Sequence, residues 1–232
     1  MADKFLLINY NPNCTWIYPI LNALNAANDD LKKRTEEWEK VGLSELGLAL
    51  STKLRMISIV VERIDKHLGK LSEELQGDKE KALEFYRGGY AYTVKHIDPF
   101  VLVVDLEAFI FETRSTYEIV GKFIVAFFKY ILLKDITEAD LTKMLEEKGI
   151  DVTWIKELQI NRITFFHNTA PWIGIKPIND DLARVEVLIL KKNIKELESA
   201  DDYVSFDLLR SVYENFGISL NAIQGFLISE IK

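Results

Sequence analysis

Apolar residues between Leu50 and Leu75 recur at alternating spacings of four and three, and this series constrains the fold more than any other feature of the chain. Such spacings place side chains on one stripe of an α-helix and suit packing along antiparallel neighbours. Ser44 is a residue type that caps helices and Gly77 one that ends them, so we predict a helix over 44–77. At about 1.5 Å per residue it is roughly 50 Å long. The residues of the series are Leu50, Leu54, Ile57, Val61, Ile64, Leu68, Leu71 and Leu75.

A helix of that length needs long partners, and the strongest candidate begins at Asp98-Pro99. The aspartate can cap the first turn, and proline fits the first helical position. We predict that this helix continues to Leu133. Apolar spacing and capping residues predict further helices over about 15–40, 78–86, 137–149, 151–167 and 205–230.

The helix from Pro99 has two different polar sets. Asp105 and Glu112 fall opposite the main polar stripe, among aromatic and aliphatic residues. A carboxylate on an apolar face is costly without a partner, so we expect both to face the core or a cleft. The residues of the main polar stripe, which we expect to be solvated, are Glu107, Arg114, Glu118, Lys122 and Lys129.

The segment 179–202 is ambiguous, because the short apolar run 185–190 fits either a lone strand or the start of a helix. No internal repeat or linker divides the chain. We therefore predict an all-α fold, an up-and-down bundle of long helices with short accessory helices and at most one short strand near 185–190. It forms a single domain over 1–232, with the main bundle at about 44–168 and a C-terminal helix at about 205–230.

Composition narrows the function classes. The net charge of −7 disfavours non-specific nucleic-acid binding, although it allows a local basic cleft. The single cysteine, Cys14, permits no internal disulfide and favours a reducing compartment. The N-terminus has no secretory pattern, and charged residues interrupt the most apolar region, 99–133. We expect a cytoplasmic protein without a membrane segment.

Few residues carry recognisable chemistry. The three histidines are scattered, and no metal-binding, phosphate-loop or nucleophile-elbow motif is present, so we predict neither a metal nor a cofactor. The exception is Arg162, which falls on the apolar face of the helix predicted over 151–167 and precedes His167 by five positions. One interpretation is structural: Arg162 forms a salt bridge with Asp105 or Glu112, and His167 ends the helix.

The other interpretation is catalytic. A guanidinium such as that of Arg162 can stabilise a phosphoryl oxyanion. A histidine such as His167 can accept a proton from a ribose 2′-hydroxyl or donate one to the leaving oxygen. Together they suffice for RNA cleavage by internal transesterification without a metal.

The Arg-x4-His pattern of Arg162 and His167, late in an all-helical chain, resembles the HEPN superfamily of helical, commonly dimeric proteins. Many of its members are metal-independent endoribonucleases of toxin–antitoxin and defence systems. The resemblance covers roughly residues 44–168. It implies a catalytic role for Arg162 and His167, and Glu112 as a carboxylate that orients Arg162. It also implies a homodimer, RNA as the target and an antitoxin protein as a partner.

One position departs from the family pattern. Active members usually carry a polar residue directly after the arginine, where this chain has Ile163. The alternative function is therefore a catalytically inactive helical module for dimerisation or interaction. Five residues also rotate two side chains about 140° apart on an ideal helix, so a shared site is easiest to form across a two-fold axis.

Overall fold

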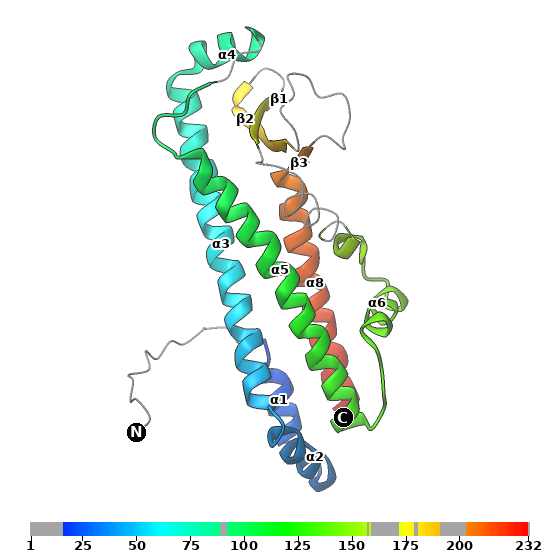
Figure 1. Cartoon of the computed structure of the whole chain (residues 1–232). Helices are drawn as coiled ribbons and strands as arrows, with labels where there is room; N and C mark the ends of the chain where they lie inside the picture. The colour runs from blue at the N-terminus through cyan, green and yellow to red at the C-terminus, as the bar shows by residue number, and fades with distance from the viewer. Residues whose placement is uncertain are drawn as a thin grey trace, which may run out of the picture.

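Three long helices form the frame of the molecule (Figure 1). The structure is a computed structural model that describes residues 16–88, 92–156, 158, 172–178, 181–190 and 203–231. The long helices are α3 (Leu43–Gly77), α5 (Pro99–Phe127) and α8 (Phe206–Ile231). The predictions of long helices over 44–77, from Pro99 and over 205–230 are confirmed, and the protein is mostly helical.

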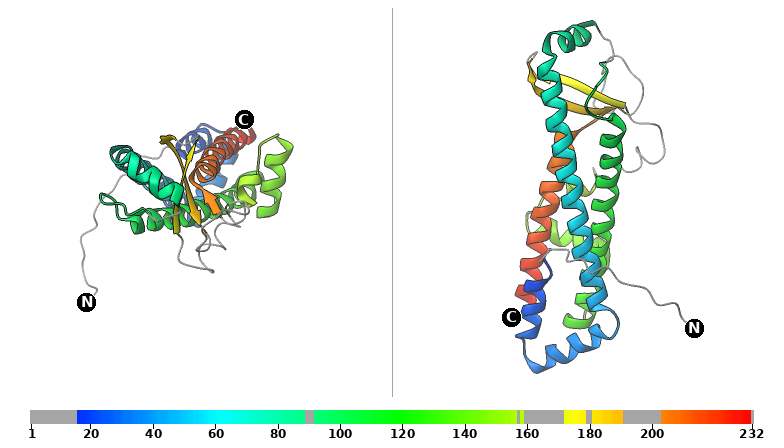
Figure 2. Two further views of the ribbon diagram at one scale, coloured as in Figure 1. Left: turned by 90° about the horizontal axis from the view of Figure 1, so that it is seen from above. Right: turned by 90° about the vertical axis from the view of Figure 1, so that its left-hand side faces the viewer.

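α3 and α5 run antiparallel and pack along each other, and α8 lies beside them (Figures 1 and 2). α8 runs in the same direction as α5. Between them the chain passes through α6 (Glu138–Glu147), which contacts both α5 and α8, and later through a small sheet at the far end of the frame. Among the described residues no helix is both long enough and apolar enough to cross a membrane.

The N-terminal helix predicted over 15–40 is instead two helices, α1 (Tyr18–Asn25) and α2 (Asp29–Glu39). Asn28 between them is extended, with φ −65° and ψ 166°, and its side chain accepts a hydrogen bond from the backbone N–H of Leu31 at 3.0 Å. Asparagine favours this capping geometry over a helix interior. The apolar periodicity continues across the break, which is why it suggested one helix.

The start of α3 also differs from the predicted cap. Gly42, with a φ of 117°, takes the capping position in a conformation that residues with a Cβ rarely adopt. The hydroxyl of Ser44 donates instead to the carboxylate of Glu39 at the end of α2. Ser44 therefore links two helices instead of starting one.

The C-terminal end of α5 widens into a π-helical turn, η1 (Phe128–Leu132), and the chain then turns at Leu133 in the left-handed region. A guanidinium nitrogen of Arg34 on α2 donates to the carbonyl oxygen of Ile131 at 2.7 Å. Carbonyls near a helix end lack intrahelical partners, so this hydrogen bond satisfies one of them and holds α2 against η1.

A three-stranded antiparallel sheet closes one end of the frame. Of the two alternatives left open for 185–190, the strand is the one observed, as part of β2 (Asp181–Leu190), which pairs with β1 (Trp172–Ile178) and β3 (Tyr203–Ser205). The expectation of at most one strand was wrong. β1 contains a glycine and a proline, which disfavour strands, and β3 is too short to show a periodicity.

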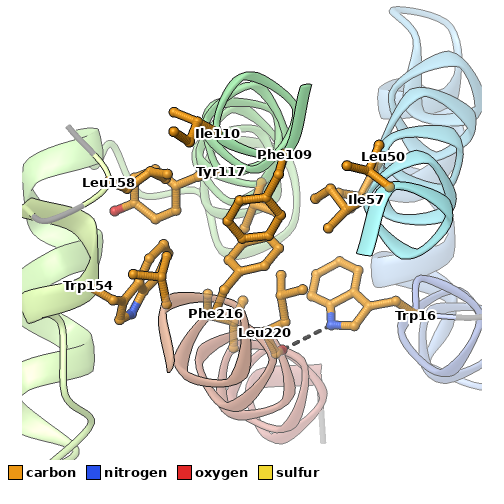
Figure 3. Packing of buried hydrophobic residues seen from close by; sticks show 14 of the residues in the cluster. Trp16, Leu50, Ile57, Phe109, Ile110, Tyr117, Trp154, Leu158, Phe216 and Leu220 are labelled. Carbon is orange, nitrogen blue, oxygen red and sulfur yellow. Dashed lines mark hydrogen bonds between the residues drawn. The ribbon is translucent and has the colours of Figure 1, made fainter. Parts of the chain in front are cut away.

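The described helices and strands share one apolar core (Figure 3). Two buried tryptophans find acceptors for their indole N–H groups on α8. Nε1 of Trp16 donates to the carbonyl oxygen of Leu220 at 2.9 Å, and Nε1 of Trp154 donates to Oγ of Ser219 at 3.1 Å. A buried indole N–H without an acceptor destabilises a fold, so these bonds favour a single packing of α8.

Candidate functional site

Glu112, one of the three residues predicted to form the site, lies on α5 facing α3. Its carboxylate is nearly buried, as predicted, and Oε2 lies 2.6 Å from Nζ of Lys53. Lys53 Nζ also lies 5.6 Å from the ring centroid of Phe111. Lys53 therefore both neutralises Glu112 and contacts the aromatic face next to it.

Asp105, two turns earlier on α5, is completely buried and is also paired with α3. Its Oδ1 lies 2.5 Å from Nη2 of Arg63, and its Oδ2 lies 3.3 Å from Nδ1 of His67. Neither contact has the alignment of a hydrogen bond, so the opposite charges of Asp105 and Arg63, with His67 close beside them, hold this cluster together.

The sequence did not indicate Lys53, Arg63 and His67 as partners of these carboxylates. A signal was present in retrospect. Arg63 and His67 are four residues apart on one helix, and the later carboxylate, Glu112, pairs with the earlier cation, Lys53. Antiparallel packing of α3 on α5 requires this order. Using this order to pair the residues would have required knowing that α3 and α5 are neighbours.

Arg162 and His167 lie outside the described residues, as does Ile163. The catalytic roles of Arg162 and His167, and the orientation of Arg162 by Glu112, therefore stay predictions. The described chain ends before this motif at Leu158 and resumes after it at Trp172, the first residue of β1.

The chain that leads into the motif is firmly anchored. Asp151 accepts hydrogen bonds at Oδ1 from the backbone N–H of Thr153 at 2.9 Å and from its hydroxyl at 2.8 Å, so it caps the helical turn that follows, as predicted. The backbone hydrogen bond and then the hydroxyl bond lower the pKa of the Asp151 carboxyl below its ordinary value, because both stabilise the charged form.

Trp154 follows this cap and is completely buried. Its ring meets the rings of Tyr117 on α5 and Phe216 on α8 edge-on, with centroids 5.4 Å apart in both pairs. Leu158 is buried on the same flank of α5, beside Ile110 and Tyr117 (Figure 3). Trp154 and Leu158, eight and four residues before Arg162, are therefore fixed to the frame.

Glu112 and Leu158 lie on different flanks of α5. Ile110, beside Leu158, and Glu112 are two residues apart, which on an α-helix is a rotation of about 200°. Glu112 faces α3, whereas Leu158 lies on the flank toward α6. Within the described part of the chain, Lys53 is thus the cation paired with Glu112, and α5 itself separates this carboxylate from Leu158.

Metal ligands do not gather in the described part of the chain: no group of three or more histidine, cysteine, aspartate or glutamate side chains there is close enough to hold an ion. Compared with protein-family models, with curated proteins and with solved structures, the chain gives no match.

Proposed function

We propose that the protein is a HEPN-like, metal-independent endoribonuclease or RNA-binding protein of a toxin–antitoxin or defence system, with Arg162 and His167 at its centre. In this proposal residues 44–168 and the helix over 205–230 form an up-and-down bundle that acts as a homodimer. Support comes from the Arg-x4-His pattern and from the rigid frame to which the chain directly before it is attached.

The anchoring of Leu158 is the observation that carries the proposal. Leu158 is 1% exposed and precedes Arg162 by four residues. Catalytic groups act best when rigid elements position them, and the Asp151 cap and buried Trp154 supply such an element.

Each residue has a defined chemical task. His167 removes the proton from a ribose 2′-hydroxyl, whose oxygen attacks the adjacent phosphorus as the bond from phosphorus to the 5′-oxygen breaks, and water donates a proton to that leaving oxygen. The products are a 2′,3′-cyclic phosphate and a 5′-hydroxyl. Arg162 stabilises the charge that develops on the phosphoryl oxygens. In this proposal Glu112 orients Arg162, so Arg162 and Lys53 compete for the same carboxylate.

The test is RNA cleavage in the presence of EDTA. We expect wild-type protein to cleave a structured RNA and both His167→Ala and Arg162→Ala to lose at least about 100-fold in rate, the usual contribution of such groups. His96→Ala is the matched control, because His96 is an exposed histidine that is not part of the Arg-x4-His sequence. Equal cleavage by wild type and His167→Ala, or none by either, contradicts the catalytic proposal.

A second candidate function, a catalytically inactive dimerisation or interaction module, is favoured by the outer face of α5. Phe100 is 76% exposed and Val104 is 57% exposed, and their spacing of four places them on one stripe of the helix. Large exposed apolar side chains on one stripe are typical of an interface between proteins. Ile163 in place of the usual polar residue favours the same function.

The two candidates separate by oligomeric state and activity. If α5 forms the dimer interface, Phe100→Glu with Val104→Glu gives a monomer by light scattering. Lys33→Gln with Glu37→Gln, changed at exposed positions on α2 at the other end of the frame, leaves the mass unchanged. A dimer that cleaves no RNA supports the interaction module, and a wild-type monomer contradicts it.

A further inference from the structure

A pocket of about 370 Å³ opens between α3, α8 and the sheet, at the end of the frame opposite α1 and α2. Its size lies within the usual range for sites that hold small organic molecules. α3 contributes Val61, Ile64 and Leu68 to the wall, and β2 contributes Val185 and Val187. The pocket arises because the sheet covers α3 and α8 where the two helices diverge.

The floor of the pocket is aromatic. Phe109 of α5 and Tyr213 of α8 line it, with their ring centroids 6.3 Å apart in an edge-to-face contact. Phe206, at the start of α8, adds a third ring. Aromatic faces bind apolar bodies and also attract ammonium groups through their negative π-faces.

The positive and negative charges at the mouth of the pocket do not cancel. Asp65 of α3 and Arg210 of α8 line the pocket and pair with each other, with Oδ1 and Nη2 2.6 Å apart. The guanidinium is thereby committed to a carboxylate. Asp207 lies one turn before Arg210 and also lines the pocket, and within the described part of the chain it makes no ion pair.

The usual structural role of an acid at this place does not account for Asp207. Oγ of Ser205 accepts the hydrogen bond from the backbone N–H of Leu208 at 3.1 Å and so caps the start of α8. An aspartate in the first turn of a helix is stabilised by the helix dipole. That benefit does not require the side chain to line the pocket, as Asp207 does. Asp207 thus adds one uncompensated negative charge to an apolar pocket.

We propose that this pocket binds a small amphipathic cation, with an apolar or aromatic body between α3, α8 and the sheet and an ammonium group at Asp207. A carboxylate or phosphate ligand would meet the repulsion of Asp207, because Arg210 and Asp65 already offset each other's charge. The site uses no residue of the Arg162–His167 motif, so it stands independently of the proposed nuclease.

The probes are three molecules of one shape and different charge: 4-phenylbutylamine, 4-phenylbutanol and 4-phenylbutyrate. Titration calorimetry on the full chain at neutral pH and low salt gives their Kd values. We expect the amine to bind about tenfold more tightly than the carboxylate, with the alcohol between them, since the exposed Asp207 attracts the ammonium and repels the carboxylate and the two effects add. Equal Kd values for amine and carboxylate overturn the proposal.

Two variants locate the binding. Asp207→Asn reduces the preference for amine over alcohol to less than about threefold. Glu214→Gln, an equal charge change at an exposed site on α8 outside the pocket, leaves it unchanged. Val61→Phe narrows the pocket from a half-buried position and weakens all three probes. Wild-type affinity in Val61→Phe, or no binding of any probe at millimolar concentration, refutes the site.

Discussion

Nζ of Lys53 on α3 and Oε2 of Glu112 on α5 lie 2.6 Å apart, inside the interface of the two longest helices of the protein. The lysine side chain is 23% exposed and the glutamate side chain 10%. The pair is therefore largely withdrawn from water, and the glutamate is the more dependent partner. This asymmetry determines what each substitution costs.

We expect Lys53→Met to destabilise the protein by about 3 kcal/mol, because it leaves the Glu112 carboxylate nearly buried without a cation. Glu112→Leu costs less, about 1 kcal/mol, since the longer lysine can reach water. The double variant Lys53→Met with Glu112→Leu recovers most of the loss. Urea unfolding measures the four free energies, and strictly additive costs would contradict the coupling.

Asp105 holds the same interface by a different route, through Arg63 and His67. Asp105→Asn removes a buried negative charge that two α3 side chains depend on, and we expect a loss of about 2–3 kcal/mol. Glu118→Gln is the control, because it also replaces a carboxylate on α5 by an amide. Oε1 of Glu118 lies 3.0 Å from Nε of Arg114, in an exposed ion pair. Its cost is expected below about 1 kcal/mol. Similar losses in the two variants would show that burial of Asp105 is energetically unimportant.

Two glycines are expected to respond to alanine in opposite directions. Gly69 lies within α3, and an added Cβ meets no atom within 4 Å, so Gly69→Ala should stabilise the protein by roughly 0.5–1 kcal/mol through helix propensity. Gly149 has a φ of 71° at the turn after α6, so Gly149→Ala should destabilise it by about 1 kcal/mol. Thermal unfolding of both variants reports the sign, and a loss of stability in Gly69→Ala contradicts the first expectation.

The cap at Asp151 predicts a pH dependence. Its pKa is lower in the folded protein than in the unfolded chain, because the backbone N–H of Thr153 binds the carboxylate. The unfolded state therefore takes up a proton first as the pH falls. The contribution of Asp151 is fully present above the ordinary carboxyl pKa and disappears as the pH falls through the lowered one.

The measurement compares urea midpoints of wild type and Asp151→Asn from neutral pH down to about pH 2. The wild-type advantage should be constant near neutrality and shrink at acid pH. A titration of the Asp151 carboxyl by NMR gives the same pKa directly. A difference between the proteins that does not change with pH would exclude this role for the carboxylate.

Sequence patterns predicted the elements whose stability is local. The four-three spacing from Leu50 to Leu75 placed α3, and Asp98-Pro99 placed the start of α5, because periodicity and capping act within a few residues. The burial of Asp105 and Glu112 also followed from the helical wheel alone. At the start of α6, predicted to begin at 137, the backbone N–H of Thr137 donates to the carboxylate of Asp140 at 2.7 Å, another contact within a few residues.

Tertiary structure decided which groups meet. No sequence pattern specified that Lys53 would pair with Glu112, or that Arg63 and His67 would share Asp105, because these contacts depend on how α3 lies along α5. The β1 strand forms by pairing with β2, which compensates for its glycine and proline. The pocket at Asp207 likewise exists only where α3, α8 and the sheet converge. Local propensity acts over a few residues, whereas ion pairs, sheets and pockets join residues that are distant in the chain.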